Sequence, residues 1–198
     1  MSIPFPSIVE SINGRERGFD MWTRLLADRI VFLGSEIDDK VANVIVAQLL
    51  ILEATEPDEA ITMYIQSPGG TADAGLAIYD TMNLISCPVH TVCVGNAASM
   101  GAFLMAAGEP GYRRILPSSR MLIHQISSGA RGTMSDMEIS VAEGKRLNRY
   151  IMECLAKSTG KTLRQIKKAM DRDSWFNAEE AVKFGLVDEI TKSRKVRS

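Results

Sequence analysis

The chain has 198 residues, 45% of them hydrophobic and 24% charged, and a formal net charge of −1 at pH 7. This length and apolar content suffice to bury a substantial core, and no stretch rich in Pro, Gly or Ser divides the sequence, so we expect a single domain over residues 1–198. The near-zero charge, with basic residues scattered along the chain, gives no argument for a nucleic-acid partner.

The three cysteines, Cys87, Cys93 and Cys154, lie in apolar surroundings and lack the spacing of metal ligands. They predict reduced core thiols in a reducing compartment, with neither disulfides nor a bound metal. The N-terminus lacks the basic start and the long apolar run of a secretory signal, and no stretch is long and apolar enough to span a bilayer. The expected location is therefore cytoplasmic, in a bacterium or in the interior of an organelle, with no membrane contact.

From residue 30 onward, strand and helix patterns alternate. Strands are predicted at 30–33, 61–66, 89–95 and 120–125, and helices near 40–53, 72–85 and 99–107. In the first of these helices, apolar residues recur at helical spacing and predict a core-facing stripe: Val41, Val44, Ile45, Leu49 and Leu52. Such alternation is typical of parallel β-α units and indicates an α/β fold.

A glycine turn follows the strand at 61–66. The chain continues through Ser67-Pro-Gly-Gly-Thr before the next helical pattern begins. A strand, a Gly-Gly turn and a helix together expose unpaired N–H groups at a helix N-terminus, where negative charge is favoured. Because the chain has neither the P-loop pattern nor Gly-x-Gly-x-x-Gly, a nucleotide site is disfavoured and an oxyanion site is favoured.

Ser99 lies in a turn of small residues between the apolar strand at 89–95 and an apolar helix. A nucleophilic serine needs such a turn, a base within hydrogen-bond reach and N–H donors for the oxyanion. Ala97, Ala98 and Gly101 leave room for the turn and for a substrate carbonyl. Taken alone, the pattern is more often a close helix–sheet contact with Ser as N-cap, so the interpretation depends on a partner.

The chain has two histidines. His90 lies near the start of the strand that leads to Ser99, about 17 Å or more from it, so we expect a structural role. His124 nearly ends the strand at 120–125, where a general base belongs. The alternative, that His124 only makes hydrogen bonds within a packed strand end, stays open.

Residues 135–157 predict a long helix in which many charged residues separate the apolar ones, a pattern that fits either a projecting helix or an ordinary surface helix. A shorter helix is expected around 163–170. Several acidic residues near these helices are equally plausible partners for a histidine on composition alone: Asp136, Glu138, Asp171 and Asp173.

Four motifs, in this order and spacing, resemble those of the ClpP peptidases: Tyr-Ile-Gln-Ser-Pro-Gly-Gly (64–70), Ala-Ala-Ser-Met-Gly-Ala (97–102), Met-Leu-Ile-His-Gln (121–125) and Asp-Arg-Asp (171–173). The similarity spans nearly the whole chain. It implies a crotonase-like spiral of ββα units, with a protruding strand-helix handle at about 127–159 and a short N-terminal axial-loop segment at about 1–20.

The resemblance also implies roles for single residues. Ser99 matches the nucleophile, His124 the general base, and Asp173 the carboxylate that orients the imidazolium. The backbone N–H groups of Gly70 and Met100 match the oxyanion hole, and no metal or organic cofactor is required. The positions that match the binding site for an extended substrate strand are Gly69, Thr71, Ser127, Ser128 and Gly129. Backbone pairing of that kind gives broad specificity.

The implied assembly is a homo-oligomer of two stacked heptameric rings. The rings enclose the sites in a chamber fed by a hexameric AAA+ unfoldase of the ClpX/ClpA/ClpC type, which uses the ATP. Asp171 and Arg172 match inter-ring contact positions. Leu50, Tyr64 and Leu84 match apolar positions at which the ATPase docks.

Two positions depart from the pattern. The family usually has Pro after His-Gln, where this chain has Ile126, and an aromatic position of the docking pocket falls on Arg114.

Taken together, the motifs and the resemblance predict a serine endopeptidase subunit that degrades unfolded proteins and peptides for protein quality control. One alternative is a low-activity regulatory or structural ring subunit that needs a second ClpP paralogue. Another, a crotonase-type acyl-CoA enzyme acting through glutamates, is disfavoured by the Ser-Met-Gly and His-Gln motifs.

Overall fold

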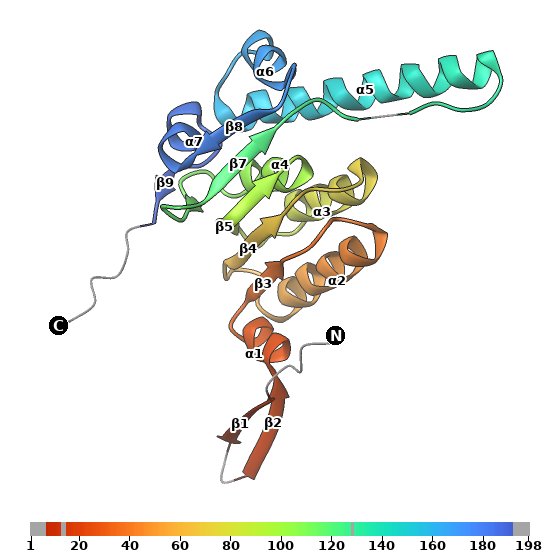
Figure 1. Cartoon of the computed structure of the whole chain (residues 1–198). Helices are drawn as coiled ribbons and strands as arrows, with labels where there is room; N and C mark the ends of the chain where they lie inside the picture. Colours follow the sequence, from red (N-terminus) through yellow and green to blue (C-terminus); the bar gives the residue numbers. More distant parts are fainter. Residues whose placement is uncertain (1–6, 13–14, 128, 192–198) are drawn as a thin grey trace.

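The computed structural model describes residues 7–12, 15–127 and 129–191 (Figure 1). The strands are β1 (Ser7–Ile12), β2 (Arg15–Asp20), β3 (Ile30–Leu33), β4 (Ile61–Ser67), β5 (Val89–Ala98), β6 (Arg113–Ile115), β7 (Arg120–Ile123), β8 (Ser174–Asn177) and β9 (Glu189–Ile190). The helices are α1 (Met21–Ala27), α2 (Asp39–Thr55), α3 (Ala72–Leu84), α4 (Met100–Ala106), α5 (Met134–Thr159), α6 (Leu163–Met170) and α7 (Ala178–Phe184).

A mostly parallel seven-stranded sheet forms the centre of the molecule. Its main path runs β3-β4-β5-β6-β9 with every neighbouring pair parallel, while β7 also pairs in parallel with β5, and β8 is antiparallel to β7. Because β5 is ten residues long, its residues 91–93 pair with β6 and its residues 96–98 with β7. Helices α2, α3 and α4 pack in succession along one side (Figure 1), and the predicted α/β class is confirmed.

The core follows the apolar periodicity of the sequence, with one exception. In β4, Ile61, Met63 and Ile65 are all 0% exposed, as the alternation predicts. On α2 the buried face consists of Ala42, Ile45, Leu49 and Leu52. Val44 was predicted to join this stripe but is 56% exposed. It lies one residue from Ile45, about 100° around the helix, and so falls outside the buried face.

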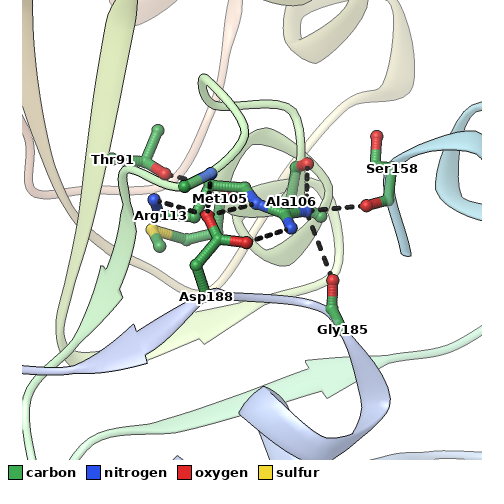
Figure 2. A network of polar contacts seen from close by, with 8 residues as sticks. Thr91, Met105, Ala106, Arg113, Ser158, Gly185 and Asp188 are labelled. Carbon is green, nitrogen blue, oxygen red and sulfur yellow. Dashed lines mark hydrogen bonds and ion pairs between the residues drawn. The ribbon is translucent and has the colours of Figure 1, made fainter. Parts of the chain in front are cut away.

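A buried arginine ties the C-terminal part of the chain to the sheet (Figure 2). Arg113, on β6, donates from Nε and Nη2 to the carboxylate of Asp188, with Nη2 2.5 Å from Oδ1. Its Nη1 donates to the carbonyls of Ala106, Ser158 and Gly185, at the ends of α4, α5 and α7. One guanidinium group on β6 therefore joins the terminal turns of three helices to Asp188, the residue before β9, and we call these contacts the Arg113 network.

Helix α5 projects well beyond the body of the molecule (Figure 1). Its last part packs on the core through Ile151, Met152 and Leu155, whereas Met134 and Ile139 near its start are 70% and 68% exposed. The predicted handle is thus present in its helical part. Its predicted strand is not formed: residues 124–127 and 129–133 have no regular structure, since no strand lies beside them in the described part of the chain.

The predicted axial-loop segment at about 1–20 forms a β-hairpin where it is described. Strands β1 and β2 pair antiparallel, and the Asp20 carboxylate then caps α1 by accepting from the N–H groups of Trp22 and Thr23. Residues 1–6 and 13–14 of that segment lie outside the described residues. No helix in the ranges described above is long and apolar enough to cross a membrane.

Candidate active site

Ser99 lies at the junction of β5 and α4 in a strained backbone conformation. Its φ of 53° and ψ of −122° place a non-glycine residue outside the ordinary allowed regions, which costs about 1–3 kcal/mol. Two backbone hydrogen bonds maintain the turn: the Ser99 N–H donates to the Leu122 carbonyl at 2.8 Å, and the Ser99 carbonyl accepts from Phe103 at 3.0 Å. The hydroxyl makes no capping hydrogen bond, so the N-cap alternative raised by the sequence does not account for this serine.

The glycine turn after β4 meets the Ser99 turn. A Cβ on Gly69 would lie 2.6 Å from the Cβ of Ser99 and 3.1 Å from the Met100 nitrogen, so only glycine allows this approach, and its φ of +95° favours glycine too. The Ser67 hydroxyl braces the turn by accepting from the Gly69 N–H at 3.1 Å and donating to the Ser35 carbonyl.

Two backbone donors lie at this junction of the two turns. Ile37 pairs with the turn by donating to the Gly69 carbonyl and accepting from the Thr71 N–H, which leaves the Gly70 N–H outside the ladder. Met100 is the first residue of α4, and its N–H has no acceptor within the helix. Two such N–H groups beside a serine form an arrangement suited to an oxyanion.

His124 follows the last residue of β7 and lies across from Asp173. The antiparallel register pairs Ile123 with Ser174, so the next residues outward, His124 and Asp173, oppose each other. His124 Nδ1 lies 3.9 Å from Asp173 Oδ1, which is within ion-pair range but too long for a hydrogen bond. The Asp173 side chain is 70% exposed and that of His124 24%. Of the carboxylates in the described ranges, Asp173 is the one within 4 Å of His124.

Ser99 and His124 line one cleft of about 520 Å³. Its polar rim includes Gly70, Thr71 and Ser127. Its apolar wall comes from α4, β7, α5 and α6: Met100, Phe103, Ile123, Ile151, Leu155 and Met170. The sequence did not indicate this wall or the rim residue Glu36, because their proximity depends on contacts between distant elements.

The remaining predicted residues are distributed more widely. Gly69 shapes the turn, Gly129 is exposed, and Ser128 lies outside the described residues. The Asp171 carbonyl accepts from the side-chain amide of Gln125 at 3.1 Å, and the Arg172 side chain is exposed.

The predicted docking residues lie on the surface of the helical layer and on β4. Leu50 on α2 and Leu84 at the end of α3 are 43% and 76% exposed, while Tyr64 is half-buried on β4. Arg114, the departure from the pattern, pairs with Glu189 at 2.6 Å.

His90 stacks on Tyr112, with ring centroids 4.1 Å apart and ring planes 4° from parallel. Burial, and then the charge of Arg114, lower the pKa of His90 below its ordinary value. The His90 ring does not line the cleft of Ser99, which fits the expected structural role.

Among the described residues, no group of three or more His, Cys, Asp or Glu side chains is placed to hold a metal ion. Cys87 and Cys93 are buried free thiols, and burial raises the pKa of Cys93 to about 12. These cysteines are therefore part of the packing.

The chain matches a protein-family model. The model described as "Clp protease" covers residues 13–194, and so includes the elements that carry both turns, the cleft and α5.

Proposed function

Because the chain belongs to the Clp protease family, we propose that it is the proteolytic subunit of an ATP-dependent Clp protease and that it acts as a serine endopeptidase. Family membership confirms the resemblance drawn from the four motifs and the ClpP-type fold, and it makes the chain a peptidase. One observation carries the finer proposal: the Ser99 turn meets the Gly69-Gly70 turn at the edge of a cleft that also holds His124.

The proposed reaction proceeds in two stages. His124 takes the proton of the Ser99 hydroxyl as its oxygen attacks a peptide carbonyl, and the N–H groups of Gly70 and Met100 stabilise the oxyanion. The protonated His124 then gives its proton to the leaving amine, which leaves an acyl-enzyme. Water, activated by His124, cleaves the ester and frees Ser99, while Asp173 stabilises the imidazolium formed in each stage.

The proposed substrate is an unfolded polypeptide in an extended conformation. The segments at 69–71 and 127–129 would pair with its backbone, and the apolar wall of the cleft would receive a side chain. Recognition through backbone groups gives broad specificity, which suits a function in protein quality control and regulated degradation.

The proposed assembly is the homo-oligomer of two stacked heptameric rings, which encloses the sites and receives substrate from an AAA+ unfoldase. The exposed apolar residues near the start of α5, Met134 and Ile139, support contacts with other copies of the chain. In this proposal the unfoldase binds the ATP, the peptidase needs no cofactor, and the complex is cytoplasmic or lies inside an organelle. A low-activity subunit that needs a paralogue is not favoured, since Ser99, His124 and Asp173 are all present.

Intact mass after treatment with a fluorophosphonate tests this proposal, because an unactivated serine does not react. We expect a single adduct on the wild-type chain that is absent from Ser99→Ala and His124→Ala. Ser118→Ala, which removes an exposed serine outside the cleft, is the matched control and should label normally. An adduct that persists in Ser99→Ala, or an unlabelled wild-type protein, would contradict the proposal.

A further inference from the structure

The position of the His124 ring depends on the backbone around it. At 3.9 Å, the Asp173 carboxylate is too far from Nδ1 to hold the ring by a hydrogen bond. The carboxylate is also 70% exposed, so water competes for its oxygens. The placement of His124 in the cleft that it shares with Ser99 therefore depends largely on the main chain of residues 123–126.

Three elements hold that stretch of main chain. Ile123 pairs with Ser174 of β8. The Gln125 N–H donates to the Met170 carbonyl at the end of α6, at 2.8 Å. The Ile126 N–H donates to the side-chain oxygen of Asn148 on α5, at 3.1 Å. The first two of these contacts join backbone to backbone, whereas the third depends on the identity of the side chain at 148. The Gln125 side chain adds a further contact by donating from its amide to the Asp171 carbonyl at 3.1 Å.

The hydrogen bond between Ile126 and Asn148 takes the place of the backbone constraint that a proline at 126 would supply and that this chain lacks. A proline at 126 would have a fixed φ and no N–H to satisfy. Ile126 is free in φ, and its N–H is partly buried because its side chain packs against the core and lines the cleft. A partly buried donor without an acceptor is unfavourable. Asn148 supplies that acceptor, and it comes from the part of α5 next to the core-packed residue Ile151.

We propose that Asn148 is a positioning residue for His124, which it holds beside Ser99 by fixing the main chain at Ile126. The inference rests on the proposed function, in which His124 is the base. Asn148 does not line the cleft and touches no reacting atom. Its effect passes through two residues of backbone to the imidazole.

Two measurements on the full-length protein separate this role from a general structural one. The first is amide hydrogen exchange of the peptide at 121–127, which does not depend on activity. The second is the rate of fluorophosphonate labelling, together with kcat and KM for a short peptide substrate. Asn148→Leu should speed exchange about 5-fold and slow labelling and kcat about 5- to 20-fold, with KM changed less than about 2-fold.

Asn148→Asp is the conservative variant, because a carboxylate offers an acceptor oxygen in either orientation. It should restore exchange and labelling to within about 2-fold of the wild type. Arg149→Gln is the matched control on the same helix, since the Arg149 guanidinium pairs with Glu153 one turn along and is exposed. It should change neither measurement.

Ile126→Pro removes the donor and completes the test. In that background Asn148→Leu should have no more than about a 2-fold further effect on labelling, because no hydrogen bond is left to lose. Equal effects in both backgrounds, no rescue by Asn148→Asp, or unchanged exchange in Asn148→Leu would each overturn the proposal. If the wild-type protein is not labelled at all, the proposed function fails, while the exchange measurement still decides whether Asn148 holds Ile126.

Discussion

Two of the ion pairs that join the C-terminal part of the chain to the strands before it differ in almost every physical respect. Arg113 and Asp188 approach to 2.5 Å with side chains 8% and 22% exposed. His124 and Asp173 are 3.9 Å apart, and the carboxylate is 70% exposed. The first pair is packed among the ends of three helices, whereas the second opens to solvent at the rim of a cleft.

The difference teaches that the first pair is part of the packed fold, whereas the carboxylate of the second is left open to solvent. The Arg113 network takes all its acceptors from within one chain (Figure 2). Asp173 keeps a solvent-facing carboxylate next to Arg172 and Asp171, the residues that match inter-ring contacts. In the proposed assembly, contacts with another copy of the chain would tighten the second pair.

The largest expected effect is on activity. Asp173→Asn should lower kcat about 10³- to 10⁴-fold, because the imidazolium formed in each stage loses the negative charge that stabilises it. The free energy of unfolding should stay within about 0.5 kcal/mol of the wild-type value, since the side chain is mostly exposed. Peptidase assays and urea unfolding of the same preparation check both parts. A large loss of stability in this variant would remove the distinction between the two pairs.

Breaking the Arg113–Asp188 pair should instead affect mainly the stability of the fold. Arg113→Met should lower the free energy of unfolding by about 3–5 kcal/mol, because it leaves the Asp188 carboxylate and buried carbonyls without their donor. Arg114→Gln is the matched control: it breaks an ion pair whose side chains are 42% and 54% exposed and should cost less than about 1 kcal/mol. If urea unfolding showed equal losses of unfolding free energy in Arg113→Met and Arg114→Gln, the Arg113 network would not be the source of the stability.

The pH dependence of the unfolding free energy in acid gives a further test of the Arg113–Asp188 pair. Although burial of Asp188 opposes its ionisation, hydrogen bonds from Arg113 hold the pKa of that carboxyl below its ordinary value of 3.8. The stabilisation is therefore complete above about pH 4 and is lost as pH falls through the folded-state pKa. The destabilisation caused by Asp188→Asn should be largest near neutral pH and should shrink below pH 4 in unfolding experiments. A difference that is constant with pH would contradict this linkage.

The smallest expected effect is that of substituting His90, and it concerns the pH dependence of stability. Burial lowers its pKa below the ordinary value of 6.5, so the unfolded chain takes up a proton first as the medium is acidified. Stability should fall slightly as pH drops through 6.5, and His90→Phe, which keeps the stack on Tyr112, should remove that part of the slope. Peptidase activity of the variant should be unchanged. A loss of activity would mean that this histidine also serves the site.

The sequence predicted what local patterns and strong motifs determine. The strand at 30–33 and the turns at Gly69 and Ser99 follow from alternation and from small residues at tight turns. The Arg113–Asp188 contact was not predicted, since its partners are 75 residues apart and no local pattern links them.

Tertiary pairing also moved the boundaries of predicted elements. Strand β5 was predicted to end at Gly95 but continues to Ala98, because residues 96–98 find a second partner in β7. The predicted strand of the handle does not form at 124–127 and 129–133, because no strand in the described part of the chain pairs with it. Asn148 shows the same limit, because nothing in its helical context marks it as the acceptor for Ile126.

The ladder between β5 and β7 has a mechanical consequence for the reaction. Ala98 pairs with Leu122, and the Ser99 N–H donates to the Leu122 carbonyl, so serine and histidine each sit one or two residues beyond the same pair of strands. Their separation is thus set by the pairing of these two strands of the sheet. On warming, peptidase activity and the folded state should accordingly disappear over a single temperature range.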